Sequence, residues 1–159
     1  MVLYVKNKLI SLGGSSFVID ENDEKVFEIK GKLFSPTHKK FIYDMQGNKL
    51  FTVRNKYWHF FTKKAFIFDK DGQKYCKIKE RFFGRTTDIV DCEDELILKD
   101  NGLGKGVSIF KNGKEIGNWG INFDLMRDSY KLEVLDETET SLLVALVIAI
   151  DNIRDNRRK

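Results

Sequence analysis

The chain has 159 residues, of which 42% are hydrophobic and 33% charged, a composition typical of one soluble globular domain. Its 28 basic and 24 acidic residues leave a net charge of +4, and both signs are mixed along most of the chain, so we expect no nucleic-acid partner. The two cysteines, Cys76 and Cys92, are too few for a disulfide framework or a zinc site, so we expect a reducing, cytoplasmic setting.

The N-terminal stretch, MVLYVKNKLISLGG, is expected to contain the first strand. It has neither a long apolar segment nor a small-residue cleavage site, so we expect no signal peptide. Residues 1–159 are therefore expected to form one domain, with no metal and no cofactor.

Three segments of the chain repeat one pattern and align without gaps, beginning at Phe17, Phe41 and Phe66. Each starts with an aromatic residue, two apolar residues and an aspartate, then makes a short polar break and continues with an alternating apolar stretch. Alternation of this kind is typical of a half-buried strand, so each repeat is interpreted as a β-hairpin of about 18 residues. A weaker fourth copy begins at Val107.

The polar breaks carry turn residues, since Gly47, Gly72 and Gly113 can adopt a positive φ without a steric clash. With the N-terminal strand and the segments near residues 89–98 and 130–135, the hairpins predict about ten to twelve antiparallel strands. So many twisted strands usually curl closed or divide into two sheets.

The C-terminal segment contains an unbroken apolar run, residues 142–150, within a stretch that has no Gly or Pro. Asp136 and Glu139 have the spacing of a capping box, so a helix is predicted over about residues 138–156. A buried strand is the alternative, because many of these residues are β-branched. As a helix, about twelve residues at 1.5 Å each span about 18 Å of the roughly 30 Å bilayer core, so we expect no transmembrane segment.

A helix that is apolar on every side has to be surrounded by protein, and the strands are the available partner. We therefore predict a mainly β fold, a closed antiparallel β-barrel of about twelve strands built from repeated hairpins over about residues 1–135. The central hydrophobic α-helix, over about residues 138–156, would leave little room for a ligand inside the barrel.

Three features resemble the LURP-one-related proteins of the tubby C-terminal-like superfamily, which includes the phospholipid scramblases. They are the stretch KLISL, the hairpins of form Phe-x-(Ile/Tyr/Phe)-Asp-x-x-Gly, and the segment DETETSLLVALVIAID. The resemblance implies a twelve-stranded barrel around a central helix, and relatives of tubby bind phosphoinositides at the membrane surface. The first hairpin departs from the pattern, because Asp23 stands where the others have glycine, which affects the local turn type.

Other motifs favour ordinary structural roles. NGLGKG, residues 101–106, leads into a strand rather than a helix, so a flexible connection is favoured over a phosphate-binding loop. His38 and His59 have no Cys or carboxylate at metal-ligand spacing, and surface histidines are favoured over a catalytic base. Cys76 is expected to be a core thiol. Cys92 lies in the acidic stretch VDCEDE, which should raise its pKa and keep it unreactive.

Asp151 directly follows the apolar run, so we expect it near the barrel mouth, where it would accept hydrogen bonds. A solvated carboxylate at the helix exit is the more common alternative. An enzyme acting on a small ligand at the barrel mouth would use this residue.

The links between hairpins should gather at one rim of the barrel, and their sequences combine aromatic with basic residues. Rings can enter the headgroup layer of a membrane while lysine and arginine attract anionic lipids. The links also contain Phe34 and Phe83. The alternative is that the aromatic rings are packed strand ends and the lysines solvated edges. The predicted lipid-binding residues are Lys39, Lys40, Trp58, Phe60, Phe61, Lys63, Lys64, Arg81 and Arg85.

The sequence thus favours a non-enzymatic, cytoplasmic binding module that is peripheral to anionic membrane surfaces and uses this aromatic-basic rim. Anionic phospholipid headgroups are the expected partner. The alternative is a structural scaffold that binds a protein partner through its loops, and the small-ligand enzyme ranks below both. Scramblase activity is not expected, because no segment is long enough to span a bilayer.

Overall fold

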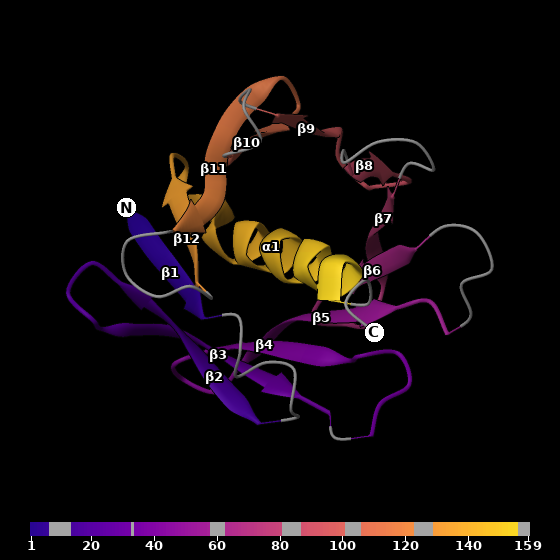
Figure 1. The fold of residues 1–159 in the computed structure, drawn as a ribbon, viewed down its shortest axis with the longest axis horizontal. Coiled ribbons are helices and arrows are strands. Elements are labelled where there is room, and N and C mark those ends of the chain that lie inside the picture. Colours follow the sequence, from indigo (N-terminus) through magenta and orange to yellow (C-terminus); the bar gives the residue numbers. More distant parts are fainter. Residues whose placement is uncertain are drawn as a thin grey trace.

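The computed structural model describes residues 1–6, 14–32, 34–57, 63–80, 87–100, 106–122 and 129–155. These residues form one twelve-stranded sheet that curls around a helix near the C-terminus (Figure 1). The strands are β1 (Val2–Lys6), β2 (Ser15–Asp20), β3 (Lys25–Gly31), β4 (Lys40–Asp44), β5 (Lys49–Asn55), β6 (Lys64–Phe68), β7 (Lys74–Glu80), β8 (Thr87–Val90), β9 (Leu96–Asp100), β10 (Gly106–Lys111), β11 (Lys114–Asn122) and β12 (Ser129–Val134). A 3₁₀ turn, η1 (Glu137–Glu139), precedes the helix α1 (Thr140–Asp155).

The strand order across the sheet is β8-β7-β6-β5-β4-β3-β2-β1-β12-β11-β10-β9. Neighbouring strands are antiparallel, and β1 to β8 follow chain order, as expected for consecutive hairpins. The pairing of β1 with β12 joins the two halves of the sheet. The predicted mainly β, antiparallel architecture with a C-terminal helix is therefore confirmed.

The predicted closure of the barrel is not confirmed. Strands β8 and β9 form the two edges of the sheet, and among the described residues no backbone ladder joins them. The segment between these strands instead forms backbone hydrogen bonds with β7 on one side and with the β10–β11 turn on the other. Glu93 N donates to Tyr75 O on β7 at 3.1 Å, and Asn112 N donates to Glu95 O at 2.8 Å. The sheet therefore has a seam between β8 and β9 that backbone hydrogen bonds leave open.

The aspartate that recurs in each repeat holds its hairpin turn. Asp44 Oδ1 accepts the backbone N–H groups of Gln46 and Asn48 at 3.0 and 2.8 Å, and Asp20 and Asp69 make the equivalent pair of bonds in their own turns. Glycine follows in a left-handed conformation in two of these turns. Asp23 takes that place in the first, with a φ of 62°, so the departure from the pattern changes the residue and keeps the backbone shape.

The apolar run is helical, so the alternative of a buried strand is wrong. Asp136 caps η1 by accepting the N–H of Thr138 at 3.2 Å, and α1 continues to Asp155, close to the predicted end at residue 156. Residues 142–150 are all buried. Within the described part of the chain, no helix combines the length and the apolar character needed to cross a bilayer.

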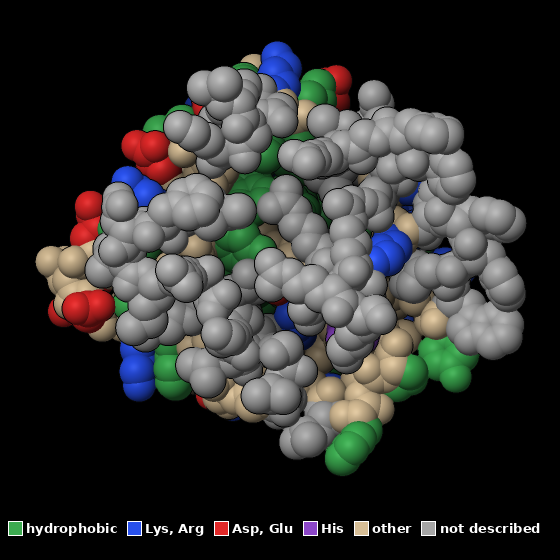
Figure 2. All heavy atoms as spheres, in the orientation of Figure 1, with side chains coloured by type: hydrophobic (Ala, Val, Ile, Leu, Met, Phe, Trp, Pro, Cys, Tyr) green, Lys and Arg blue, Asp and Glu red, His purple; other side chains and the backbone are tan. Residues whose placement is uncertain are grey.

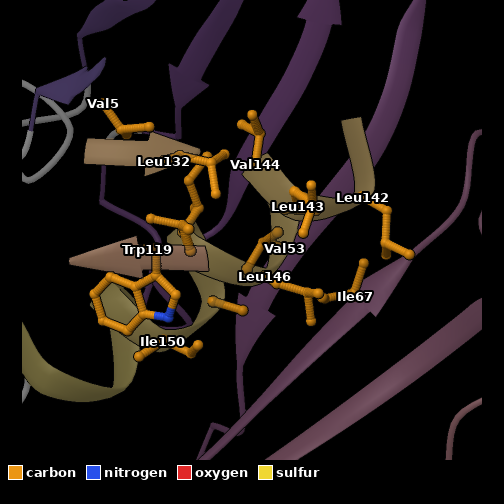
Figure 3. Packing of buried hydrophobic residues seen from close by; sticks show 14 of the residues in the cluster. Val5, Val53, Ile67, Trp119, Leu132, Leu142, Leu143, Val144, Leu146 and Ile150 are labelled. Atoms are coloured by element: carbon orange, nitrogen blue, oxygen red, sulfur yellow. The ribbon is translucent and has the colours of Figure 1, made fainter. Parts of the chain in front are cut away.

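The core lies between α1 and the inner face of the sheet. Figure 3 shows Leu146 beside Val53 of β5 and Ile67 of β6, and Ile150 beside Trp119 of β11. At Gly117 of β11 the sheet lies close to the Leu143 side chain of the helix. A Cβ there would lie 2.7 Å from Glu133 O and 2.9 Å from Leu143 Cδ1, so only glycine fits without a shift.

Cys76 and Cys92 form a disulfide, so the expectation of two free thiols is wrong. The backbone bond from Glu93 N to Tyr75 O brings the segment after β8 alongside β7 and places the two cysteines together. This contact connects residues that are 16 positions apart in sequence, and spacing alone does not reveal it.

Side chains bridge the seam at the end where the hairpin turns lie. The carboxylate of Asp94, which follows β8, accepts the Tyr75 hydroxyl at 2.7 Å and lies 3.1 Å from Lys111 Nζ on β10. The same ammonium lies 2.7 Å from Glu139 Oε1 in η1. Burial and the bond to Asp94 raise the pKa of Tyr75 to about 12. Burial alone would lower the pKa of Lys111, but its hydrogen bonds to Glu139 and Asp94 raise it overall.

Candidate functional site

The links between hairpins lie at the end of the sheet where α1 terminates. In an antiparallel meander, alternate connections lie at the same end of the strands, so the β3–β4 and β5–β6 links lie together. Figure 1 shows both links on the side of the C-terminus. Asn152 near the end of α1 donates through Nδ2 to His38 O in the β3–β4 link at 3.1 Å. We call this end of the molecule the link rim, formed by the described residues 31, 32, 34–40, 55–57, 63 and 64.

The structure separates the predicted lipid-binding residues into three groups. Lys39, Lys63 and Lys64 lie half-buried at the link rim, and Lys39 Nζ is 5.3 Å from the centre of the Phe41 ring. Lys40 is buried, with 4% exposure, so it is not the solvated headgroup contact that the sequence predicted. The remaining predicted residues lie outside the described residues, namely Trp58, Phe60, Phe61, Arg81 and Arg85.

Two aromatic side chains of the link rim are exposed. Phe34 is 98% exposed and Tyr57 is 66% exposed. Figure 2 shows hydrophobic side chains protruding over the β3–β4 and β5–β6 links, whereas acidic side chains gather over the β2–β3 turn at the left. Part of the rim is therefore apolar surface open to solvent and not packed strand end.

Phe34 stands on a loop held by its own hydrogen bonds. We call this the Phe34 loop, residues 32 and 34–39. Lys32 N donates to Lys39 O at 2.9 Å, and His38 N donates to Ser35 O at 3.0 Å. Ser35 Oγ accepts Lys39 N at 3.2 Å. Phe34 has a φ of 54°, a left-handed backbone that bulky residues rarely adopt, so the loop holds this ring outward at a conformational cost.

Three lysines form a row across the outer face of the sheet beside Tyr57. Lys56 N donates to Lys64 O at 2.9 Å, and Lys64 is the cross-strand partner of Lys79. The adjacent residues Asn55, Ala65 and Ile78 are buried, so alternation directs the three ammonium groups outward. Partial burial lowers the pKa of Lys64, and the charges of Lys56 and Lys79 lower it further.

Like charges opposite each other destabilise a sheet, so the lysine row is favourable only if counter-charge lies nearby. Elsewhere on the sheet, Lys74 and Lys77 on β7 share Asp91, with nitrogen–oxygen distances of 2.8 and 3.3 Å. Lys56, Lys64 and Lys79 have no such pair within the described part of the chain. The lysine row therefore presents net positive charge beside the exposed rings.

Beneath the link rim lies a buried polar cluster at the end of α1. The Asp151 carboxylate accepts the Tyr130 hydroxyl at 2.8 Å and lies 3.7 Å from Lys40 Nζ. Asp151, Tyr130 and Lys40 are 7%, 6% and 4% exposed, so the alternative of a solvated Asp151 is wrong. Burying two opposite charges without their partners would be costly, so each holds the other in place.

Two asparagines extend this cluster toward the Phe34 loop. Asn55 Nδ2 donates to Asn152 O at 3.2 Å, and Asn55 N donates to Thr37 O at 2.7 Å. His38 takes part through its backbone carbonyl. The region around His59 and residues 101–105 lies outside the described residues, and among those described no group of three His, Cys, Asp or Glu side chains is arranged to hold a metal ion.

Sequence reasoning missed several residues of this region, among them Lys56, Lys79, Asn55 and Asn152. The lysine row required the register of β6 against β7, which no local pattern reveals. Each asparagine follows an apolar stretch at the end of a strand or helix, and a polar residue at such a position is usually predicted to be exposed to solvent. An amide at the end of an otherwise apolar face is the signal that would have suggested a buried hydrogen bond.

The fold and the rim define a class of protein in which a curled antiparallel sheet surrounds a hydrophobic helix. The sequence model of the LURP-one-related family matches residues 1–151. The chain therefore belongs to the LURP-one-related family.

An X-ray structure of a protein from Arabidopsis thaliana has the same fold, with a TM-score of 0.59 over 96% of this chain and 91% of that one. The two sequences are 13% identical, so this likeness bears on the fold alone. No curated protein matches the sequence.

Proposed function

We propose that this chain is a non-enzymatic binding module that docks peripherally on anionic membrane surfaces through the link rim. The observation that carries the proposal is Phe34, an aromatic side chain that is 98% exposed on a left-handed backbone. A loop that keeps a phenylalanine fully in water loses the burial free energy that the ring would gain elsewhere. Transfer of the ring out of water stabilises by about 1.5–3 kcal/mol.

The charges around the ring favour an anionic partner. Lys39 lies on the Phe34 loop, and the lysine row begins one residue before Tyr57. Each Lys or Arg close to an anionic leaflet contributes about 1 kcal/mol of attraction. Rings that enter the headgroup layer and ammonium groups that attract phosphates act together in this arrangement.

The inside of the sheet supports a binding role rather than catalysis. Residues 142–150 of α1 fill it with apolar side chains. The carboxylate of Asp151 is already bonded to Tyr130 and paired with Lys40. A catalytic acid or base needs access to a substrate proton, and this carboxylate is enclosed by its partners.

Co-sedimentation with vesicles tests the proposal. Neutral phosphatidylcholine vesicles are compared with vesicles that contain an anionic phospholipid, using the wild type, Phe34→Ala, and a Lys39/Lys56/Lys64→Glu variant. We expect binding to anionic vesicles that Phe34→Ala lowers at least fivefold and the triple variant abolishes. Met45→Ala and Lys70→Glu, at the opposite rim, are matched controls and should bind as the wild type does.

Wild-type protein that binds neither kind of vesicle would overturn the proposal. Equal binding by the wild type and both link-rim variants would do the same. The alternative of a protein-interaction scaffold would then be tested by asking whether Phe34→Ala loses a partner that Met45→Ala retains.

A further inference from the structure

The end of α1 holds the Phe34 loop through two consecutive residues. Asp151 pairs with Lys40, and Asn152 donates through Nδ2 to His38 O at 3.1 Å. Lys40 and His38 flank the C-terminal end of the loop. The helix thus contacts the chain on both sides of Lys39, far from its own position in the sequence.

Asn55 completes the connection from the sheet. Its backbone N–H donates to Thr37 O at 2.7 Å, and its Nδ2 donates to Asn152 O at 3.2 Å. That carbonyl belongs to the last described turn of α1. One buried amide therefore binds both the Phe34 loop and the helix end.

Burying two amides at this contact costs free energy of folding. Asn55 and Asn152 are each 2% exposed, and Asn55 Oδ1 has no hydrogen-bond partner among the described residues. An unpaired buried polar atom costs about 1–3 kcal/mol. His38 also has a left-handed φ of 48°, which a non-glycine residue seldom adopts. Cost and strain are both concentrated where the helix meets the loop.

We propose that Asn152, together with Asn55, is a positioning residue that sets the conformation of the Phe34 loop for membrane docking. The inference rests on the proposed function, but its structural half can be measured without any membrane. The hydrogen bond to His38 O holds the C-terminal end of the loop, and the internal bonds of the loop then direct Phe34 outward.

The first test is amide hydrogen exchange in solution. In Asn152→Ala, the amides of Lys32, His38 and Lys39 should exchange at least tenfold faster than in the wild type. The turn residues Gly47 and Gly72, at the opposite rim, should be unchanged. Asn48→Ala removes an amide from the β4–β5 turn, where Nδ2 donates to Asp44 Oδ2 at 2.8 Å, and serves as the matched control.

The second test is a double-mutant cycle on anionic vesicles. We expect Asn152→Ala to lower binding at least fivefold in the wild-type background and less than twofold in the Phe34→Ala background. A residue that acts only on overall stability would lower binding by the same factor in both backgrounds.

Unchanged exchange of the loop amides in Asn152→Ala would overturn the inference, and so would effects that multiply in the double variant. If the alanine variant does not fold, Asn152→Leu replaces it because the volume is kept. Amide hydrogen exchange of the wild-type protein gives an independent check. The free energies of opening measured at the amides of His38 and Asn55 should equal those measured in the last turn of α1, and different values would contradict the proposal. If exchange responds but no vesicle binds, the positioning role stands and the membrane function fails.

Discussion

At the scale of single residues, Lys40 shows how an oppositely charged partner decides whether a lysine is buried or exposed. Lysine after a polar link is usually a solvated strand edge, so the sequence placed it with Lys39 on the surface. The structure instead pairs it with Asp151, which lies on a helix near the other end of the chain. A partner so distant in sequence has no local signal, and burial of the lysine follows only from the fold.

Replacing Lys40 tests this account. Lys40→Met keeps most of the volume but leaves the Asp151 carboxylate without its ammonium partner. Removal of one member of a buried pair destabilises by about 3–5 kcal/mol. Urea denaturation should show a loss in that range, against less than about 1 kcal/mol for Lys39→Met, whose ammonium is half-exposed. Equal losses for both variants would contradict the buried pair.

Asp136 gives a prediction about acid. Its hydrogen bonds from Lys114 and from Thr138 lower the pKa of the carboxyl to about 2, from its usual 3.8. A lowered folded-state pKa means that the stabilisation is fully present above about pH 4 and is lost as the pH falls toward about 2. The melting temperature of the wild type should therefore decline more steeply over this range than that of Asp136→Asn. Parallel curves for the two proteins would count against the assignment.

At the scale of elements, the hairpins and the helix were predictable because their signals are local. Period-two alternation and a turn aspartate define each hairpin, and nine consecutive apolar residues define the buried part of α1. The disulfide between Cys76 and Cys92 was not predictable, because it depends on how the segment after β8 folds back along β7. Two cysteines in a chain of this composition predict free thiols, because no local pattern reveals that contact.

The disulfide should stabilise β7 against the segment after β8. Closing a loop of about 15 residues contributes about 3 kcal/mol in the chain-entropy account. Reductant should therefore lower the urea midpoint of the wild type, and Cys92→Ala should show the lower midpoint with or without reductant. A reductant effect that persists in Cys92→Ala would assign the loss to another cause.

At the scale of the whole molecule, the seam is the main difference between expectation and structure. Hairpin repeats predict which strands are neighbours, so they predict the order of β2 to β7. Closure of the barrel is predicted only from the general tendency of twelve twisted strands to curl. Strands β8 and β9 lie where the repeat pattern is weakest, and their connecting segment bonds to β7 and to the β10–β11 turn. Curling thus brings the edges near each other without pairing them. The lysine row of the link rim could not be predicted from the sequence either, because it depends on the register of β6 against β7 and not on composition.

Side chains bridge the seam instead, so we expect the molecule to lose stability in alkali. Tyr75 bridges toward Asp94, and its pKa is raised to about 12 from 10.0, chiefly by burial and then by that bond. A raised folded-state pKa means that the stabilisation is fully present below about pH 10 and is lost as the pH rises toward about 12. The pKa of Lys111 is raised by its hydrogen bonds to Glu139 and Asp94, so its ammonium stays charged at higher pH than an ordinary lysine and keeps these two ion pairs while Tyr75 ionises. Between pH 9 and 11.5, hydrogen exchange of the β8 and β9 amides should therefore accelerate more in the wild type than in Tyr75→Phe, which has no phenol to ionise.

Tyr43→Phe, on the outer face of β4, is the matched control and should follow the wild type. If both variants respond alike, the seam does not depend on the Tyr75 phenol.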